Sequence, residues 1–134
     1  MLYVIQKGYN NVIRPFDGAE IIYLVCNLVD LYYEGYPFIF SDGHAKNSYT
    51  KFFDHTHFPN IETILDYNAI KADYWSNSDN LDLKRKKQAE VLFEKEIPIE
   101  KIKGYICYNN LARKKLIDFG IKQSKIKISK VDYY

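Results

Sequence analysis

One segment of the chain couples a cationic run to a single carboxylate. Residues 84–87 read Lys-Arg-Lys-Lys, and Gln-Ala lead from them to Glu90, which is followed by the apolar residues 91–93. Cations neutralise phosphates and release counterions from a nucleic acid, while a partly dehydrated carboxylate takes up a proton more readily, as a general base must. The segment predicts a polyanion-binding surface beside a candidate catalytic Glu90. A solvated glutamate on a cationic helix face remains an alternative.

Few other residues have the types and spacing that catalysis or ligand binding requires. His44 follows Asp42 and Gly43, where its imidazole could contact a ligand or only cap a turn. Trp75, next to Tyr74, could stack on a base as aromatic residues do in single-strand binders, or it could belong to the core. His55 and His57 have no Cys, Asp or Glu at metal spacing other than Asp54, so we expect no metal site.

Composition restricts the classes of protein to which the chain can belong. Its 134 residues are 47% hydrophobic, enough for one globular domain with a real core. The net charge of +2 is too small to indicate nucleic-acid binding unless the cations are clustered. Two cysteines, each in an apolar run, make no disulfide framework. The sequence contains no signal peptide and no membrane-spanning stretch, so we expect a cytoplasmic protein.

The apolar patterns predict short, interleaved strands and helices that would position these residues. Strands are expected at residues 1–5, 21–26, 38–40, 105–108 and 126–128. The strand at 21–26 should be buried on both faces, and the one at 38–40 should end in a turn at 41–43. Expected helices cover residues 28–32, 45–54 with Asp42 as its N-cap, a short stretch from 59, about 70–75, and 111–119 capped by Asn109 or Asn110. Gly35 and Gly120 would end two of them. For residues 82–95, propensity favours a helix but alternation favours a strand.

Four motifs occur in a fixed order along the chain. They are Met1-Leu2-Tyr3, Phe-Ile-Phe-Ser-Asp-Gly-His-Ala at 38–45, Ala-Asp-Tyr-Trp at 72–75, and Lys-Arg-Lys-Lys-Gln-Ala-Glu-Val-Leu at 84–92. In this order and spacing the chain resembles the DarT family, bacterial toxins that use NAD to ADP-ribosylate bases in single-stranded DNA. The resemblance extends over nearly the whole chain, and no single motif would be sufficient for it.

The resemblance implies an α+β, ADP-ribosyltransferase-like fold across residues 1–134, with a split mixed β-sheet, surrounding helices, and a strand at 89–93. It assigns Glu90 to the family's catalytic glutamate, which orients the ribose of NAD and takes a proton from the attacking base as nicotinamide leaves. It implies NAD as substrate, single-stranded DNA and a DarG-type macrodomain antitoxin as partners, and neither a metal nor a membrane. The residues that we expect to contact DNA are His44, Tyr49, Trp75, Lys84, Arg85, Lys86 and Lys87.

One part of the family pattern has no counterpart in this sequence. The family's histidine-containing NAD-binding segment and its catalytic arginine precede the position that matches Met1, and Arg14 lies after it. We therefore expect the C-terminal portion of a catalytic domain that is N-terminally truncated, through a mis-called start codon, a split enzyme with an upstream N-terminal half, or decay. Activity of the chain alone stays open, as does a non-catalytic module that binds single-stranded DNA or a partner protein.

Overall fold

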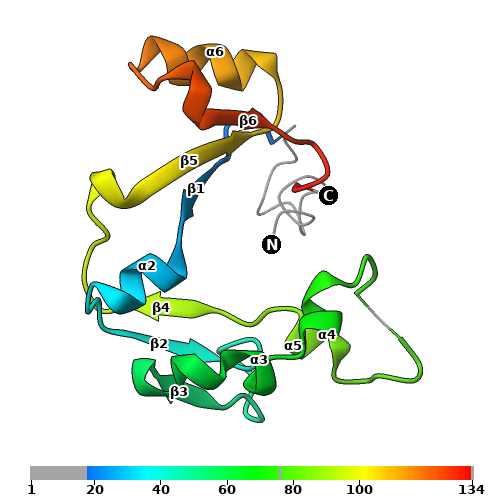
Figure 1. Ribbon diagram of the computed structural model, residues 1–134. Helices are drawn as coiled ribbons and strands as arrows, with labels where there is room; N and C mark the ends of the chain where they lie inside the picture. The colour runs from blue at the N-terminus through cyan, green and yellow to red at the C-terminus, as the bar shows by residue number, and fades with distance from the viewer. Residues whose placement is uncertain (1–17, 76, 134) are drawn as a thin grey trace. The chain divides into compact units, whose positions relative to one another are not determined.

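The chain is described by a computed structural model that covers residues 18–75 and 77–133 and divides into two compact units. We call residues 28–97 the central unit, and residues 1–27 with 98–134 the terminal unit. Each unit is built on a three-stranded sheet, and helices connect the strands (Figure 1), which confirms the predicted α+β class. The strand predicted at residues 1–5 lies outside the described residues.

The terminal unit contains a mixed sheet with strand order β1-β5-β6. Strand β5 (Ile102–Cys107) pairs antiparallel with β1 (Ile22–Cys26) and parallel with β6 (Ile126–Ile128). Short 3-10 turns at Ile99–Lys101 and Gln123–Lys125 precede β5 and β6, and α6 (Asn110–Asp118) makes the crossover that parallel strands need. Asn109 caps α6 by accepting from the Ala112 amide, and Gly120 follows the helix with a φ of 87°.

The core of the terminal unit lies between its sheet and α6. The buried side chains come from β5 and from one face of the helix: Ile102, Tyr105, Cys107, Ala112 and Leu116. The prediction that residues 21–26 are buried on both faces was wrong, because among the described strands β1 pairs with β5 alone, and Leu24 is 59% exposed. Burial raises the pKa of the Cys107 thiol, so this cysteine behaves as a small apolar side chain.

The central unit contains an antiparallel sheet with strand order β3-β2-β4. Helix α2 (Leu28–Tyr33) leads into it and is followed by Gly35, which has a φ of 80°. Strand β2 (Phe38–Ser41) lies between β3 (Phe52–Asp54) and β4 (Val91–Phe93), with Phe40 opposite both Phe53 and Val91. Phe40 is 1% exposed and stacks on Phe53 with a ring-centroid distance of 5.4 Å. The middle strand therefore anchors the unit.

Three predictions for the central unit need correction or refinement. The helix expected at residues 45–54 is absent: turns occupy 45–49 and β3 follows, because Asp42 holds the Lys51 amide instead of capping a helix. The conflict over residues 82–95 is resolved in two pieces, since α5 (Leu83–Lys86) is helical and β4 begins at Val91. The remaining helical turns are η1 (His55–Asn60), α3 (Ile61–Ile64) and α4 (Tyr67–Lys71). The helix expected at about 70–75 thus lies earlier in the chain, and residues 72–75 are not helical.

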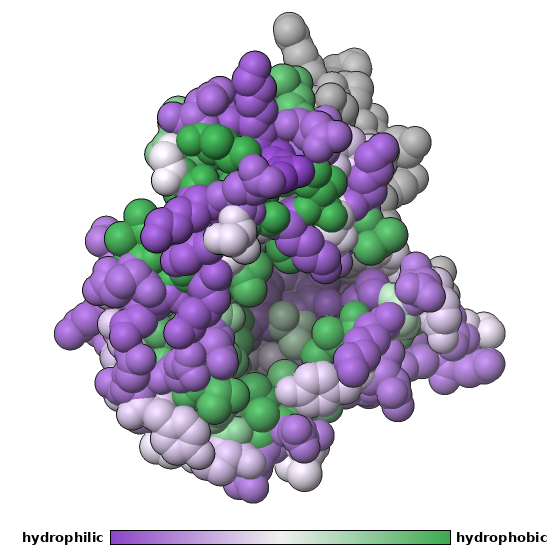
Figure 2. All heavy atoms as spheres, turned by 45° about the horizontal axis from the view of Figure 1, so that its top comes forward, coloured by the Kyte–Doolittle hydropathy of each residue, from purple (hydrophilic) through white to green (hydrophobic). Residues whose placement is uncertain are grey.

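Figure 2 shows green apolar residues interspersed with purple polar ones at the surface. Many large aromatic and aliphatic side chains are exposed. They include Tyr33, Tyr49, Tyr74 and Phe119, as expected for a chain with 13 tyrosines and 8 phenylalanines. Among the residues described, none of the helices is both long and apolar enough to span a bilayer.

Candidate active site

Glu90 is held at the edge of the central sheet by Ser41, the last residue of β2. The Ser41 amide donates to the Glu90 carbonyl at 2.9 Å, and the Glu90 amide donates to Ser41 Oγ at 3.2 Å. Ser41 Oγ itself donates to the Gly43 carbonyl at 2.7 Å. These bonds continue the β2–β4 ladder by one residue beyond β4. The backbone of Glu90 is thus fixed although the residue lies just outside a strand.

The Glu90 carboxylate faces His44, which belongs to a different motif of the sequence. Glu90 Oε1 and His44 Nδ1 lie 3.2 Å apart, and the two side chains are 38% and 42% exposed. An imidazole that donates to a carboxylate orients it, and the second carboxylate oxygen can then accept a hydrogen bond or a proton from a ligand. The pair is open to solvent and can meet a substrate.

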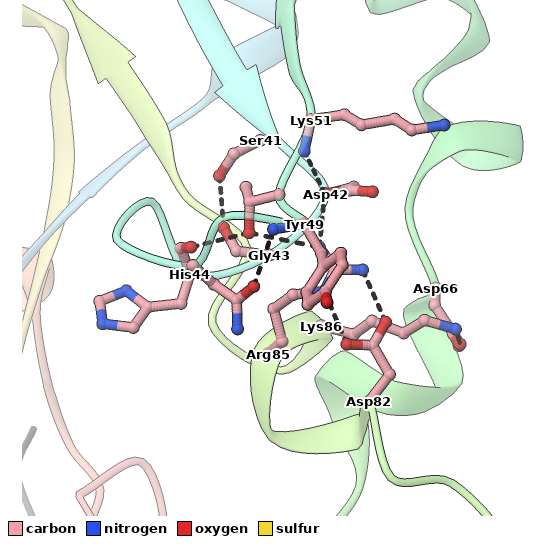
Figure 3. A network of polar contacts seen from close by, with 12 residues as sticks. Ser41, Asp42, Gly43, His44, Tyr49, Lys51, Asp66, Asp82, Arg85 and Lys86 are labelled. Atoms are coloured by element: carbon pink, nitrogen blue, oxygen red, sulfur yellow. Dashed lines mark hydrogen bonds and ion pairs between the residues drawn. The ribbon is translucent and has the colours of Figure 1, made fainter.

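Arg85 lies beneath the loop that carries His44 (Figure 3) and is only 9% exposed. Its Nε and Nη2 donate to the two carboxylate oxygens of Asp82, each at 2.7 Å, and Nη1 donates to Asp42 Oδ1 at 2.6 Å. This fork geometry is the strongest form of arginine–carboxylate pairing. The hydrogen bonds that Arg85 donates to Asp82, and then the one to Asp42, raise the pKa of the guanidinium, and the bonds from Arg85 lower the pKa of Asp82.

The cationic run does not form one DNA-facing surface. A phosphate contact by Arg85 does not fit its buried position against two carboxylates. Lys86 pairs with Asp66 at 3.0 Å, and the bond that the Ala69 amide donates to Asp66, followed by the bond from Lys86, lowers the pKa of that carboxyl. Consecutive side chains on a helix point in different directions, which explains why the four cations do not share one face.

Lys87 and Trp75, both predicted to contact DNA, contact each other. The Lys87 ammonium lies 5.3 Å from the centre of the Trp75 ring and donates to the carbonyls of Ile70 and Ala72. The indole is exposed, so its outer face remains available to a base. Lys84 and Tyr49 are also exposed, on α5 and on the loop after His44.

Sequence reasoning missed the acidic and hydroxyl groups that organise the site. Asp82 precedes Arg85 by three residues, a spacing that brings side chains together on a helix and could have indicated the pair. Asp42 and Thr50 reach Arg85 from a different segment, and no local pattern indicates this.

An open groove of about 420 Å³ also lies on the central unit, but its lining is mostly apolar and does not include Glu90. No group of His, Cys, Asp or Glu side chains that could hold a metal ion occurs within the described segments.

Comparison with known proteins identifies the class to which this fold belongs. The family model described as "ssDNA thymidine ADP-ribosyltransferase, DarT" matches residues 1–134. The chain belongs to the DarT family, as its motifs predicted.

Individual relatives agree with this membership. A DNA ADP-ribosyl transferase from Thermus sp. (strain 2.9) is 36% identical over 112 residues, which are 78% of this chain and 48% of that protein. One from Escherichia coli O127:H6 is 31% identical over 117 residues, 87% of this chain and 52% of that protein. The chain thus spans about half the length of these curated relatives.

Solved structures confirm the fold. Thermus sp. 2.9 DarT in complex with NAD+ matches with a TM-score of 0.84 and 27% identity, over 99% of this chain and 66% of that one. The same protein in complex with ADP-ribosylated single-stranded DNA matches with a TM-score of 0.83 and 27% identity, over 99% and 63%. Thermosipho africanus DarTG in complex with ADP-ribose matches with a TM-score of 0.75 at 15% identity, which supports the fold alone.

Proposed function

We propose that this chain is part of an NAD-dependent ADP-ribosyltransferase that modifies bases in single-stranded DNA, and that it acts as a toxin in the cytoplasm. The observation that carries the proposal is the pair formed by Glu90 and His44, in a chain that matches the DarT family from residue 1 to residue 134. Both side chains are accessible, and each has its backbone tied to the sheet or to Arg85.

In the proposed reaction the bond between the nicotinamide nitrogen and ribose C1′ breaks, and nicotinamide leaves with the bonding electron pair. A ring nitrogen of the base forms the new bond to C1′ and releases its proton to the Glu90 carboxylate. Glu90 also accepts a hydrogen bond from the ribose while the oxocarbenium-like charge develops. His44 holds the carboxylate in the orientation that both contacts require.

The DNA strand is proposed to contact the exposed residues of the central unit. Tyr49 and Trp75 offer aromatic faces on which bases can stack, and Lys84 offers a cation for a phosphate. The family description names thymidine, so a thymidine-containing strand is the first substrate to test. A DarG-type macrodomain is the proposed antitoxin partner, as the resemblance of the motifs implies, and co-expression in a growth assay tests it.

The experiment is an NAD-dependent transfer assay on labelled oligonucleotides. Since the chain spans about half the length of its relatives, the assay uses the chain alone and a chimera in which Thermus DarT supplies the remaining length. A mass increase of one ADP-ribose on a single-stranded, thymidine-containing oligonucleotide, with none on its duplex, is the expected result. DNA binding without transfer by either form would favour a non-catalytic single-strand-binding module.

A further inference from the structure

Arg85 is bonded to the segment around His44 at two places. Its own carbonyl accepts from the His44 amide at 2.9 Å. Its Nη1 donates to Thr50 Oγ1 at 3.3 Å, and Thr50 Oγ1 donates to the His44 carbonyl at 2.7 Å. The amide of His44 is therefore bonded to Arg85 directly and its carbonyl through Thr50, while the Asn47 amide also donates to that carbonyl.

Gly43 allows the guanidinium to lie directly against this backbone. A Cβ atom at Gly43 would be 2.5 Å from Arg85 Nη1, 2.8 Å from its Cγ and 2.9 Å from its carbonyl oxygen. Only glycine leaves that space, and the Arg85 side chain fills it. The two carboxylates that meet the guanidinium, Asp42 and Asp82, fix its orientation from both sides.

The two members of the His44–Glu90 pair are thus held in place by hydrogen bonds to different residues. Ser41 fixes the backbone of Glu90 through the sheet, whereas Arg85 fixes the backbone of His44 through a loop that has no strand or helix of its own. Without Arg85, the loop that carries His44 would keep only its internal bonds, such as the one that the Lys51 amide donates to Asp42, and the distance between the imidazole and the carboxylate would depend on these alone. A misplacement of about 1 Å in a reacting group can cost on the order of 10²-fold in rate.

We propose that Arg85 is a positioning residue of the transferase, whose guanidinium and carbonyl hold His44 in contact with Glu90, and that it is not one of the cations that bind DNA. The proposal rests on the proposed function for its kinetic part. Its structural part, the dependence of the His44 imidazole on Arg85, stands without that function.

Arg85→Lys tests the proposal because it keeps the charge but cannot form the fork with Asp82 and Asp42. The control is Lys95→Met, which removes an exposed cation of the same unit. In the transferring form, Arg85→Lys should lower kcat by roughly 10- to 100-fold and leave KM for NAD and for DNA within about 2-fold. In the chain itself, the His44 imidazole resonances, assigned with His44→Gln among only three histidines, should shift.

The possible results distinguish a positioning role of Arg85 from a phosphate contact. A folded Arg85→Lys protein with unchanged His44 resonances and unchanged kcat would overturn the proposal, and a raised KM for DNA with a reduced salt dependence would show a phosphate contact instead. If Arg85→Lys does not fold, Thr50→Val removes only the hydroxyl that links Arg85 to His44, and it should shift the same resonances to a smaller extent. If neither the chain nor the chimera transfers ADP-ribose, the proposed function fails while the resonances still decide the role of Arg85.

Discussion

The two units of the molecule differ in charge as well as in topology. The central unit carries eight Lys and Arg against twelve Asp and Glu, whereas the terminal unit carries eleven against five. The unit that contains Glu90 is therefore acidic despite its cationic run, and three of those four cations are used in contacts within the unit. The comparison shows that a cluster of cations in sequence need not form one exposed surface, and we expect the long-range attraction for a polyanion to come from the terminal unit.

The largest expected effect is a loss of stability when a core side chain is removed, because each unit has its own core. Phe40→Ala should destabilise the central unit by about 3–5 kcal/mol, because the ring is buried between two strands. Amide hydrogen exchange should then speed up in β2 and β3, with little change in β5. Leu116→Ala is the matched change in the terminal unit and should have the reverse pattern. Equal acceleration in both units for either variant would mean that they unfold together.

A smaller effect is expected at the residue that holds Glu90. Ser41→Ala removes one hydroxyl that both donates to Gly43 and accepts from the Glu90 amide, at a cost of about 1–3 kcal/mol. Chemical denaturation measures this change in the free energy of unfolding, with Ser48→Ala as the exposed control. A change no larger than that of the control would show that the ladder fixes Glu90 without the hydroxyl.

The smallest expected effect is on DNA affinity, and it tests which of the two units attracts the strand by its charge. Changing Lys122 and Lys125 of the terminal unit to Gln should weaken binding to all single-stranded sequences alike, and should reduce the slope of log K against log salt by about 0.7 for each phosphate that is no longer neutralised. The same residues changed to Arg should keep the slope. If Lys84→Gln reduces the slope and the terminal pair does not, the attraction comes from the central unit.

The sequence predicted the elements whose signals are local. Helix 110–118 has a capping asparagine and a terminal glycine, and β2 has alternating buried rings between turn residues, so both were predicted nearly to the residue. The helix predicted at residues 45–54 was wrong. Tyr49, Phe52 and Phe53 match a helical period, but the conformation of the loop depends on the hydrogen bond from the Lys51 amide to Asp42, nine residues away. Local pattern contains no information on such a contact.

The site could be predicted only in part, for the same reason. Glu90 and His44 were each singled out, but their contact depends on the pairing of β2 with β4, which brings together residues 46 positions apart. Arg85 was grouped with its neighbours because composition does not reveal which side chain of a cationic helix turns inward. Its inward direction depends on Asp42, a partner 43 positions away.

In the proposed reaction, Glu90 is the catalytic carboxylate on which transfer depends most. Glu90→Gln keeps the size of the side chain and removes the base, so in the form that transfers ADP-ribose to single-stranded DNA the rate should fall by at least about 10²-fold. Glu96→Gln, an exposed carboxylate of the same unit, should leave the rate unchanged. A Glu90→Gln protein that transfers ADP-ribose at the rate of the Glu96→Gln control would contradict the account.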